Sequence, residues 1–245
     1  MKQAFFRFYA ELNDFLPPEA RGRTLTYAFQ GEPTVKEAIE ALGVPHVEVE
    51  LIVVDGESVD FSYRLRDGDR VAVYPVFESL DVSPILKVRP EPLRRLAFAA
   101  DAHLGKLARL LRLLGFDTVH SPNISDEELV ALAREGRILL TRDRELLKHG
   151  AVTHGYWVRS TVPLEQAREV VRRFDLAGRI APFTRCLRCN GVLRPLPPEE
   201  GKRRAPPRVA AWCTAYLECP SCGGLFWPGT HYPKLAAWVR WLQAP

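Results

Sequence analysis

The first 80 residues alternate hydrophobic and polar side chains with the period of half-buried strands, and one helical pattern interrupts them. The helical pattern begins after Pro33 and Thr34 and stops at Gly43, which marks both ends of the predicted helix. Turn-forming Asp, Asn, Pro and Gly residues separate the other segments. The pattern predicts strands over residues 4–12 and 24–29, a strand with an Asp-Gly turn over 47–59, a turn followed by a last strand within 65–77, and a helix over residues 33–44. This β-β-α-β-β order describes a β-grasp, or ubiquitin-like, domain.

A second pattern begins after a linker-like stretch, residues 79–95, which holds three prolines and has no clear period. Short apolar runs there alternate with amphipathic helical stretches, which predicts an α/β domain with a parallel sheet and helices on both faces. The predicted strands cover residues 96–101, 117–120, 136–143 and 154–160, and the helices cover 102–116, 125–135, 144–150 and 162–176. Ligands of such sheets bind beyond the carboxyl ends of the strands, so functional residues are expected directly after strands.

Three aspartates stand at such positions. Asp101 and Asp143 each end an apolar strand, and Asp126 lies in the first turn of the helix that follows another strand. Facing carboxylates are costly unless a cation neutralises them, and Mg²⁺ or Mn²⁺ prefers these hard oxygen ligands. Such an ion can activate water for phosphodiester cleavage. The combination therefore predicts a catalytic Mg²⁺ or Mn²⁺ site.

Each acid also has an explanation without a metal. Asp126 would suit the positive end of its helix, and Asp143 or Asp101 could cap the helix that follows it. Thr141 could orient Asp143 by a hydrogen bond or be an ordinary β-branched strand residue.

The five cysteines lie in the last quarter of the chain, and four of them form two C-x-x-C pairs. Four cysteines in two pairs predict a closed tetrahedral site for structural Zn²⁺, with iron–sulfur ligation and a redox dithiol as alternatives. The fifth, Cys213, is expected to be buried in a strand. The predicted ligands are Cys186, Cys189, Cys219 and Cys222.

Between the two pairs lies a basic, proline-rich stretch that is predicted to be an exposed loop. Lys202, Arg203 and Arg204 could follow an RNA backbone by charge, or the stretch could be a solvated insertion without a specific role. Nearby aromatic residues could stack on bases or fill the core of the small domain; they are Tyr216, Phe226, Trp227 and Tyr232.

Charge is distributed unevenly along the chain. The formal net charge is +4, but residues 1–90 hold 10 Lys and Arg against 15 Asp and Glu, and residues 91–245 hold 24 against 15. A basic region favours a polyanionic partner, although random scatter of surface charge gives the same count. No apolar run is long enough to span a bilayer, and no signal peptide is recognisable, so a cytoplasmic location is expected.

The stretch DGDRVAVYPVF, near the end of the first domain, resembles the sulfur-carrier proteins of molybdopterin and thiamine synthesis. Those carriers end in a free diglycine, whereas this chain continues without one. The resemblance therefore implies the ubiquitin-like fold without sulfur transfer, and the domain is expected to dock or pack against a protein partner.

The stretches DAHLGKLARLLRLLGFDT and SDEELVALAREGRILLTRDREL, followed by the cysteine pairs, resemble the Mut-seven C-terminal ribonuclease family, a branch of the PIN-like nucleases. The resemblance implies hydrolysis of RNA by three or four acids around divalent metal. It places Asp101, Asp126 and Asp143 in the metal positions and offers Glu145 as a fourth acid, which could instead be a solvated helix residue.

Several basic residues near these acids could bind the substrate. Lys106, Arg109 and Arg142 are close to the predicted metal ligands in sequence, although each could be an ordinary surface charge. His103 could act near the metal or simply begin a helix.

The sequence thus predicts a ubiquitin-like domain over residues 1–80, a linker over 81–93, a PIN-like nuclease domain over 94–182, and a zinc ribbon with a C-terminal helix over 183–245. The predicted function is metal-dependent ribonuclease activity. The main alternative is a non-catalytic RNA-binding or adaptor protein that uses the ribbon and the β-grasp domain; the nuclease half of a toxin system is a third.

Overall fold

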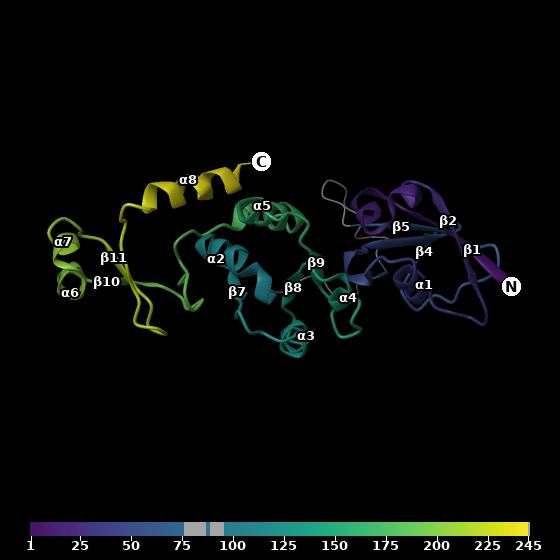
Figure 1. The fold of residues 1–245 in the computed structure, drawn as a ribbon, viewed down its shortest axis with the longest axis horizontal. Coiled ribbons are helices and arrows are strands. Elements are labelled where there is room, and N and C mark those ends of the chain that lie inside the picture. The colour runs from purple at the N-terminus through teal and green to yellow at the C-terminus, as the bar shows by residue number, and fades with distance from the viewer. Residues whose placement is uncertain (76–86, 89–95, 245) are drawn as a thin grey trace. The chain divides into compact units, whose positions relative to one another are not determined.

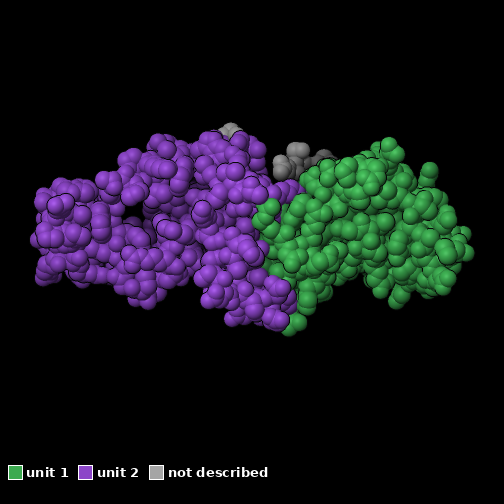
Figure 2. Space-filling model, viewed as in Figure 1, with its two compact units in different colours: residues 1–95, 133–157 green, residues 96–132, 158–245 purple. Residues whose placement is uncertain are grey.

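The computed structural model describes residues 1–75, 87–88 and 96–244. It divides the chain into two compact units, one of residues 1–95 with 133–157 and the other of residues 96–132 with 158–245 (Figure 2). Most of the predicted linker lies outside the described residues.

The first unit contains a five-stranded sheet with the order β2-β1-β5-β3-β4. Its strands β1 and β5 are parallel, and the other neighbouring strands are antiparallel. This is the β-grasp arrangement that the sequence predicts, with one additional short strand. The elements are β1 (Lys2–Phe8), β2 (Thr24–Phe29), α1 (Val35–Ala41), β3 (Leu51–Val54), β4 (Glu57–Val59) and β5 (Arg70–Tyr74) (Figure 1).

Local sequence explains the boundaries of α1 and the β3–β4 turn. Thr34 and Glu37 form a reciprocal capping box at the start of α1. Asp55 and Gly56 both have positive φ, as the tight turn between two antiparallel strands requires.

One predicted strand is wrong at its start. Residues His46–Glu48 form a short 3-10 helix, η3, rather than the beginning of a strand. His46 and Glu48 are buried and bond residues more than 100 positions away. Such distant partners override the local alternation of hydrophobic residues.

The first unit also contains β8 (Ile138–Thr141), α4 (Arg144–Leu147) and β9 (Gly155–Trp157). Strands β8 and β9 are parallel, and Leu139 is paired with Gly155. Every residue of β8 is buried, which accounts for its continuous apolar sequence. Trp157 packs against the hydrophobic core of the β-grasp sheet, so this segment contacts the core of the ubiquitin-like domain.

The second unit begins with β6 (Ala97–Ala100), the 3-10 helix η5 (Ala102–Leu104), α2 (Gly105–Leu113), β7 (Asp117–Val119) and most of α3 (Asp126–Arg134). Strands β6 and β7 are parallel. The predicted α/β fold with a parallel sheet flanked by helices is therefore confirmed.

The rest of the second unit contains α5 and the cysteine-rich region. Helix α5 packs on α2, and the last helix, α8, packs on α5 (Figure 1). A three-stranded antiparallel sheet with the order β10-β11-β12 carries the ribbon fold. The bounds are α5 (Pro163–Arg173), β10 (Arg194–Leu196), α6 (Pro198–Arg204), α7 (Pro207–Ala210), β11 (Tyr216–Glu218), β12 (Leu225–Phe226) and α8 (Tyr232–Gln243).

Two expectations for the cysteine-rich region are corrected. The proline-rich stretch forms the short helices α6 and α7 instead of a loop, because each begins with a proline at its first position and α6 also has Glu199 and Glu200 in its first turn. Cys213 is buried, but it precedes β11 rather than lying in a strand. Among the described residues, none of the helices combines the length and the apolar character needed to cross a bilayer.

Candidate active site and metal centre

The Asp101 turn, residues 101–105, directly follows the buried strand β6. Asp101 is 8% exposed, and its Oδ1 accepts a 2.8 Å hydrogen bond from the backbone N–H of His103, so it caps η5. The Nδ1 atom of His103 lies 3.7 Å from the same carboxylate oxygen, while the His103 ring itself is largely exposed. The carboxylate is thus held at the strand end by the backbone that follows it.

Asp126 is the exposed first residue of α3. The start of this helix is fixed by its neighbours: Ser125 and Glu128 exchange side-chain-to-backbone hydrogen bonds of 3.2 and 2.9 Å. Backbone and Ser125 hydrogen bonds also lower the pKa of Glu127. Because Ser125 serves as the cap, the carboxylate of Asp126 is not used for capping.

The Asp143 turn, residues 141–145, follows β8. The hydroxyl of buried Thr141 accepts a hydrogen bond from the backbone N–H of Asp143 at 2.9 Å. Asp143 in turn caps α4, since its Oδ1 accepts from the N–H of Glu145 at 2.8 Å. Glu145 pairs with Lys148 at 2.7 Å and is exposed, in line with a solvated helix residue. Thr141 therefore orients Asp143 through its backbone.

The four predicted acids are divided between the two units. Asp101 and Asp126 belong to the second unit, and Asp143 and Glu145 to the first. Their convergence on one metal ion therefore stays a prediction.

A groove of about 810 Å³ begins one residue after Asp101. Lys106 and Arg109 of α2 line it, together with Arg188 from the first cysteine pair, and all three side chains are exposed. None of the described residues that line the groove is acidic. The groove is thus a basic channel between the Asp101 turn and the cysteine-rich region.

Gly105 and His120 shape the start of this groove. The Nε2 atom of His120 lies 3.2 Å from the carbonyl oxygen of Ala102, and the ring packs closely on Gly105. A Cβ at Gly105 would lie 2.9 Å from the imidazole. His120 and Arg188 were not among the residues predicted from sequence, because their partners in the groove lie far away along the chain.

Cys186, Cys189, Cys219 and Cys222 form a group that could hold a metal ion such as zinc. Their sulfur atoms all lie within 4.8 Å of one another, and two of the pairs are 3.4 and 3.7 Å apart. Sulfurs bound to one tetrahedral Zn²⁺ are about 3.8 Å apart, given Zn–S bonds of about 2.3 Å. The four side chains therefore fit the predicted ion.

The backbone makes the same kind of turn at both cysteine pairs. Cys186 and Cys219 each accept a 2.9 Å hydrogen bond, from Asn190 and Gly223, and both of these residues have positive φ. A Cβ at Gly191 would lie 2.9 Å from the sulfur of Cys219, so only glycine fits there. These features explain the small or flexible residues after each pair.

Crowding of the thiols moves the pKa values of Cys189 and Cys219 in opposite directions. A hydrogen bond from Gly191 lowers the pKa of Cys189, but burial and the other thiols raise it to about 12. Burial raises the pKa of Cys219, whereas hydrogen bonds from Cys189 and Cys222 bring it down to about 7. A bound cation would resolve this conflict, since it stabilises all four thiolates together.

The first cysteine pair is fixed to helix α2 by a buried arginine. Arg112 of α2 is 5% exposed and donates hydrogen bonds to the carbonyl oxygens of Thr118, Leu187 and Arg188. Burial lowers the pKa of Arg112, and the thiols of Cys186 and Cys189 act in the opposite direction. A guanidinium stays charged under these conditions, so it would balance part of the charge of metal-bound thiolates.

Asn190 completes this attachment. Its side chain accepts from the backbone N–H of Thr118 at 3.0 Å and donates to Asp117 at 2.8 Å, at the start of β7. Arg185 adds a hydrogen bond to the carbonyl of Gly115. The cysteine pair therefore supplies hydrogen bonds to the backbone of β7.

The basic residues of α6 are largely paired with acids of the ribbon. Lys202 lies 3.1 Å from Glu199, and Arg204 lies 2.8 Å from Glu218. Arg203 is exposed. Arg142 is also exposed, and its carbonyl accepts a hydrogen bond from Trp157. Lys202 and Arg204 thus have a role within the ribbon whether or not they meet a substrate.

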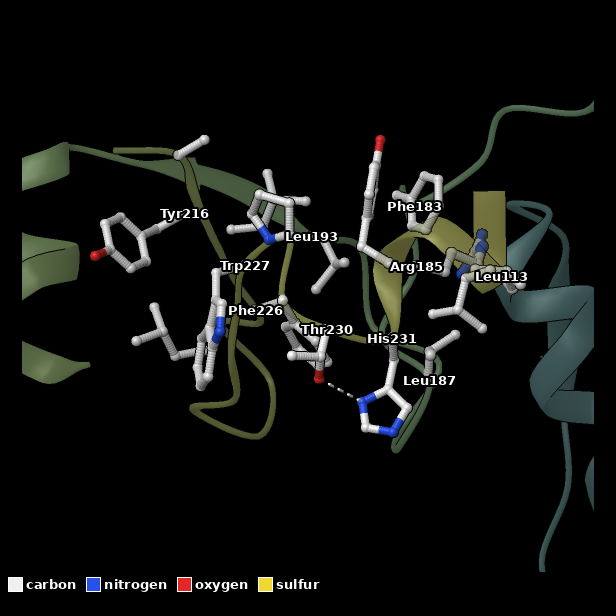
Figure 3. Close-up of a pocket in the computed structure, with 17 residues that line it drawn as sticks. Leu113, Phe183, Arg185, Leu187, Leu193, Tyr216, Phe226, Trp227, Thr230 and His231 are labelled. Carbon is white, nitrogen blue, oxygen red and sulfur yellow. Dashed lines mark hydrogen bonds between the residues drawn. The ribbon is translucent and has the colours of Figure 1, made fainter. Parts of the chain in front are cut away.

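An apolar pocket of about 830 Å³ lies between the ribbon sheet and the start of α8 (Figure 3). All four aromatic residues that the sequence offered for base stacking line it. Tyr216 is 3% exposed and donates its hydroxyl to the carbonyl of Cys213, so it belongs to the ribbon core. Tyr232 is 42% exposed and pairs with Phe183 at a ring distance of 5.0 Å.

Comparison with known proteins identifies both halves of the chain. Residues 96–239 match the Mut7-C RNAse domain, and residues 1–81 match the Mut7-C ubiquitin domain. No curated protein and no solved structure gives a match. The first match covers more than half of the chain and spans both the strand-end acids and the cysteine pairs. The chain therefore belongs to the Mut7-C RNAse family and carries a Mut7-C ubiquitin domain ahead of its RNAse domain.

Proposed function

We propose that the chain is a PIN-like ribonuclease that hydrolyses RNA with a divalent metal ion held by Asp101, Asp126 and Asp143. One observation supports this most strongly: in a domain of an RNAse family, Asp101 and Asp143 each follow a buried strand and are fixed there by backbone hydrogen bonds. We assign Glu145 as the fourth ligand; its carboxylate would first have to break its ion pair with Lys148.

The carboxylates suit Mg²⁺ or Mn²⁺ because these ions prefer hard oxygen donors. When bound, the ion would lower the pKa of a water molecule and stabilise charge on the leaving oxygen. The protein's own part is to hold the acids in place, through the caps at Asp101 and Asp143 and the Thr141 hydroxyl.

The basic groove is the proposed path of the RNA backbone. Lys106, Arg109 and Arg188 are exposed along it, and its start adjoins Asp101. Charged groups of this kind bind phosphates without reading sequence. Further proposed contacts are Arg142 on the Asp143 turn and Lys202, Arg203 and Arg204 on α6. Lys202 and Arg204 would have to bind phosphate while they remain near Glu199 and Glu218, their partners in ion pairs.

The ion at the four cysteines is proposed to be structural Zn²⁺. Four thiolates close a tetrahedral site and leave no position for a substrate. Its proposed role is to hold the first cysteine pair in the shape in which the Arg188 carbonyl accepts from Arg112 and the Asn190 side chain accepts from Thr118.

The test is to incubate the full chain with labelled single-stranded and structured RNAs in Mn²⁺, Mg²⁺ or chelator, and to compare Asp143→Asn. Asparagine also caps helices, so this variant keeps the fold while it removes the charge. The proposal expects metal-dependent cutting by the wild type and a loss of at least about 100-fold in the variant. Tight, salt-sensitive RNA binding without cutting in any metal would instead favour the non-catalytic RNA-binding protein.

A further inference from the structure

The Asp143 turn is flanked by contacts with the ubiquitin-like domain, all within the first unit. The next residue, Arg144, donates from Nη1 to the carbonyl of Phe15 and from Nη2 to the carbonyl of Asp14, both at 3.3 Å. These carbonyls end the 3-10 helix η1 (Ala10–Phe15). The last carbonyls of a helix lack partners within it, so they are natural acceptors for a cation.

Two aromatic rings hold the same guanidinium. Its central carbon lies 3.9 Å from the ring centre of Trp157 and 5.3 Å from that of Phe15. The two rings are themselves 5.0 Å apart, and Phe15 is 4% exposed. A planar guanidinium can stack on rings while its N–H groups bond carbonyls in its plane, which an ammonium cannot do.

Trp157 fixes the other side of the turn. Its Nε1 donates to the carbonyl of Arg142 at 3.3 Å, and its backbone N–H donates to the carboxylate of Glu48 at 2.7 Å. Glu48 is fully buried in η3 of the ubiquitin-like domain. The residues before and after Asp143 are therefore both tied, directly or through Trp157, to that domain.

We propose that the ubiquitin-like domain is a scaffold for the nuclease site, with Arg144 and Trp157 as positioning residues for Asp143. The inference rests on the proposed function of Asp143 as a metal ligand. An error of about 1 Å in the position of a reacting group can cost about 100-fold in rate, so such a scaffold would matter for catalysis. It gives the N-terminal domain a role inside the enzyme that requires no external partner.

The experiment compares Arg144→Ala, Arg144→Lys and Trp157→Phe in the full chain. Arg134→Ala, an exposed position at the end of α3, is the matched control. Four quantities are measured: kcat for RNA cleavage, KM, the Mn²⁺ concentration for half-maximal rate, and hydrogen exchange of peptides that cover residues 141–148. Trp157→Phe keeps an aromatic ring for stacking but removes the Nε1 donor to Arg142.

The scaffold predicts that Arg144→Ala lowers kcat about 10- to 100-fold at unchanged KM, raises the Mn²⁺ requirement, and speeds exchange in residues 141–148. Arg144→Lys should show nearly the same losses as Arg144→Ala. Trp157→Phe should change kcat, the Mn²⁺ requirement and exchange in the same direction but by less. Wild-type kcat and exchange in both Arg144→Ala and Trp157→Phe would overturn the scaffold alone. If the wild type cuts no RNA, the proposed function fails, and the exchange data still decide whether the domain orders the turn.

Discussion

The Asp101 turn and the Asp143 turn carry the same side chain after the same kind of strand, yet different parts of the chain surround them. Asp101 is nearly buried and adjoins a basic groove whose other wall includes the first cysteine pair. Asp143 is exposed, and the arginine beside it is bonded to the ubiquitin-like domain.

This difference suggests a division of labour between the added domains. Under the proposed function, the cysteine-rich ribbon would support the Asp101 side of the nuclease and contribute a cation to the RNA path, whereas the ubiquitin-like domain would order the Asp143 side. Both flanking domains would then contribute to catalysis, and neither would be an independent binding module. The following experiments would separate the two sides.

The largest effect is expected from loss of the metal at the ribbon. Cys219→Ser should release the bound zinc and expose the region from residue 183 to 230 to proteases, since structural zinc sites contribute about 10 kcal/mol or more to folding. The Asp143 turn should keep its hydrogen-exchange protection. Metal analysis and limited proteolysis check this. Cys213→Ala, at the cysteine outside the metal group, should retain the zinc, and a full zinc complement in Cys219→Ser would refute the site.

Removal of the buried guanidinium should have the next largest effect. Arg112→Met leaves three carbonyl oxygens without their donor and should lower the free energy of unfolding by about 3 kcal/mol. Denaturant unfolding measures it. Arg109→Met, on the same helix but exposed, should change stability by less than about 0.5 kcal/mol. Equal stability of the two variants would show that the ribbon is not anchored through Arg112.

Single cations of the groove should give the smallest effects. In an Asp143→Asn background, Lys106→Ala and Arg188→Ala should each weaken RNA binding about 3- to 10-fold. Each should also reduce the slope of log binding constant against log salt concentration by about 1, since one fewer counterion is released. Fluorescence anisotropy over a range of salt concentrations measures both. Arg134→Ala should change neither, and if Lys106→Ala behaves like Arg134→Ala, the RNA follows another path.

Features that depend on neighbouring residues in the chain could be predicted well. The buried strand β8, the capped helix α1 and each of the two C-x-x-C pairs depend on residues close together in the chain, and the sequence predicts all of them. Helix α6 was missed although its signal is local: its initial proline and glutamates are followed by three basic residues, but neighbouring prolines and a glycine suggested a loop.

Features that depend on distant residues could not be predicted. Arg144 bonds residues 129 and 130 positions away, and Arg112 bonds the ribbon 75 and 76 positions away. Each looks like an ordinary helix arginine in sequence. The sequence predicts caps at Asp101 and Asp143 as alternatives to metal binding, and both caps are present. The proposed function therefore assigns capping and metal binding to the same residues.

The most direct test of the central claim is a double-mutant cycle on RNA cleavage with Asp101→Asn, Asp143→Asn and the double variant. If both turns serve one metal ion, either single change removes the site, and the double variant should be no slower than the singles by more than about 3-fold. If the two losses multiply, to about 10⁴-fold or more for singles of about 100-fold, the acids act independently, and the claim of one shared metal site is contradicted.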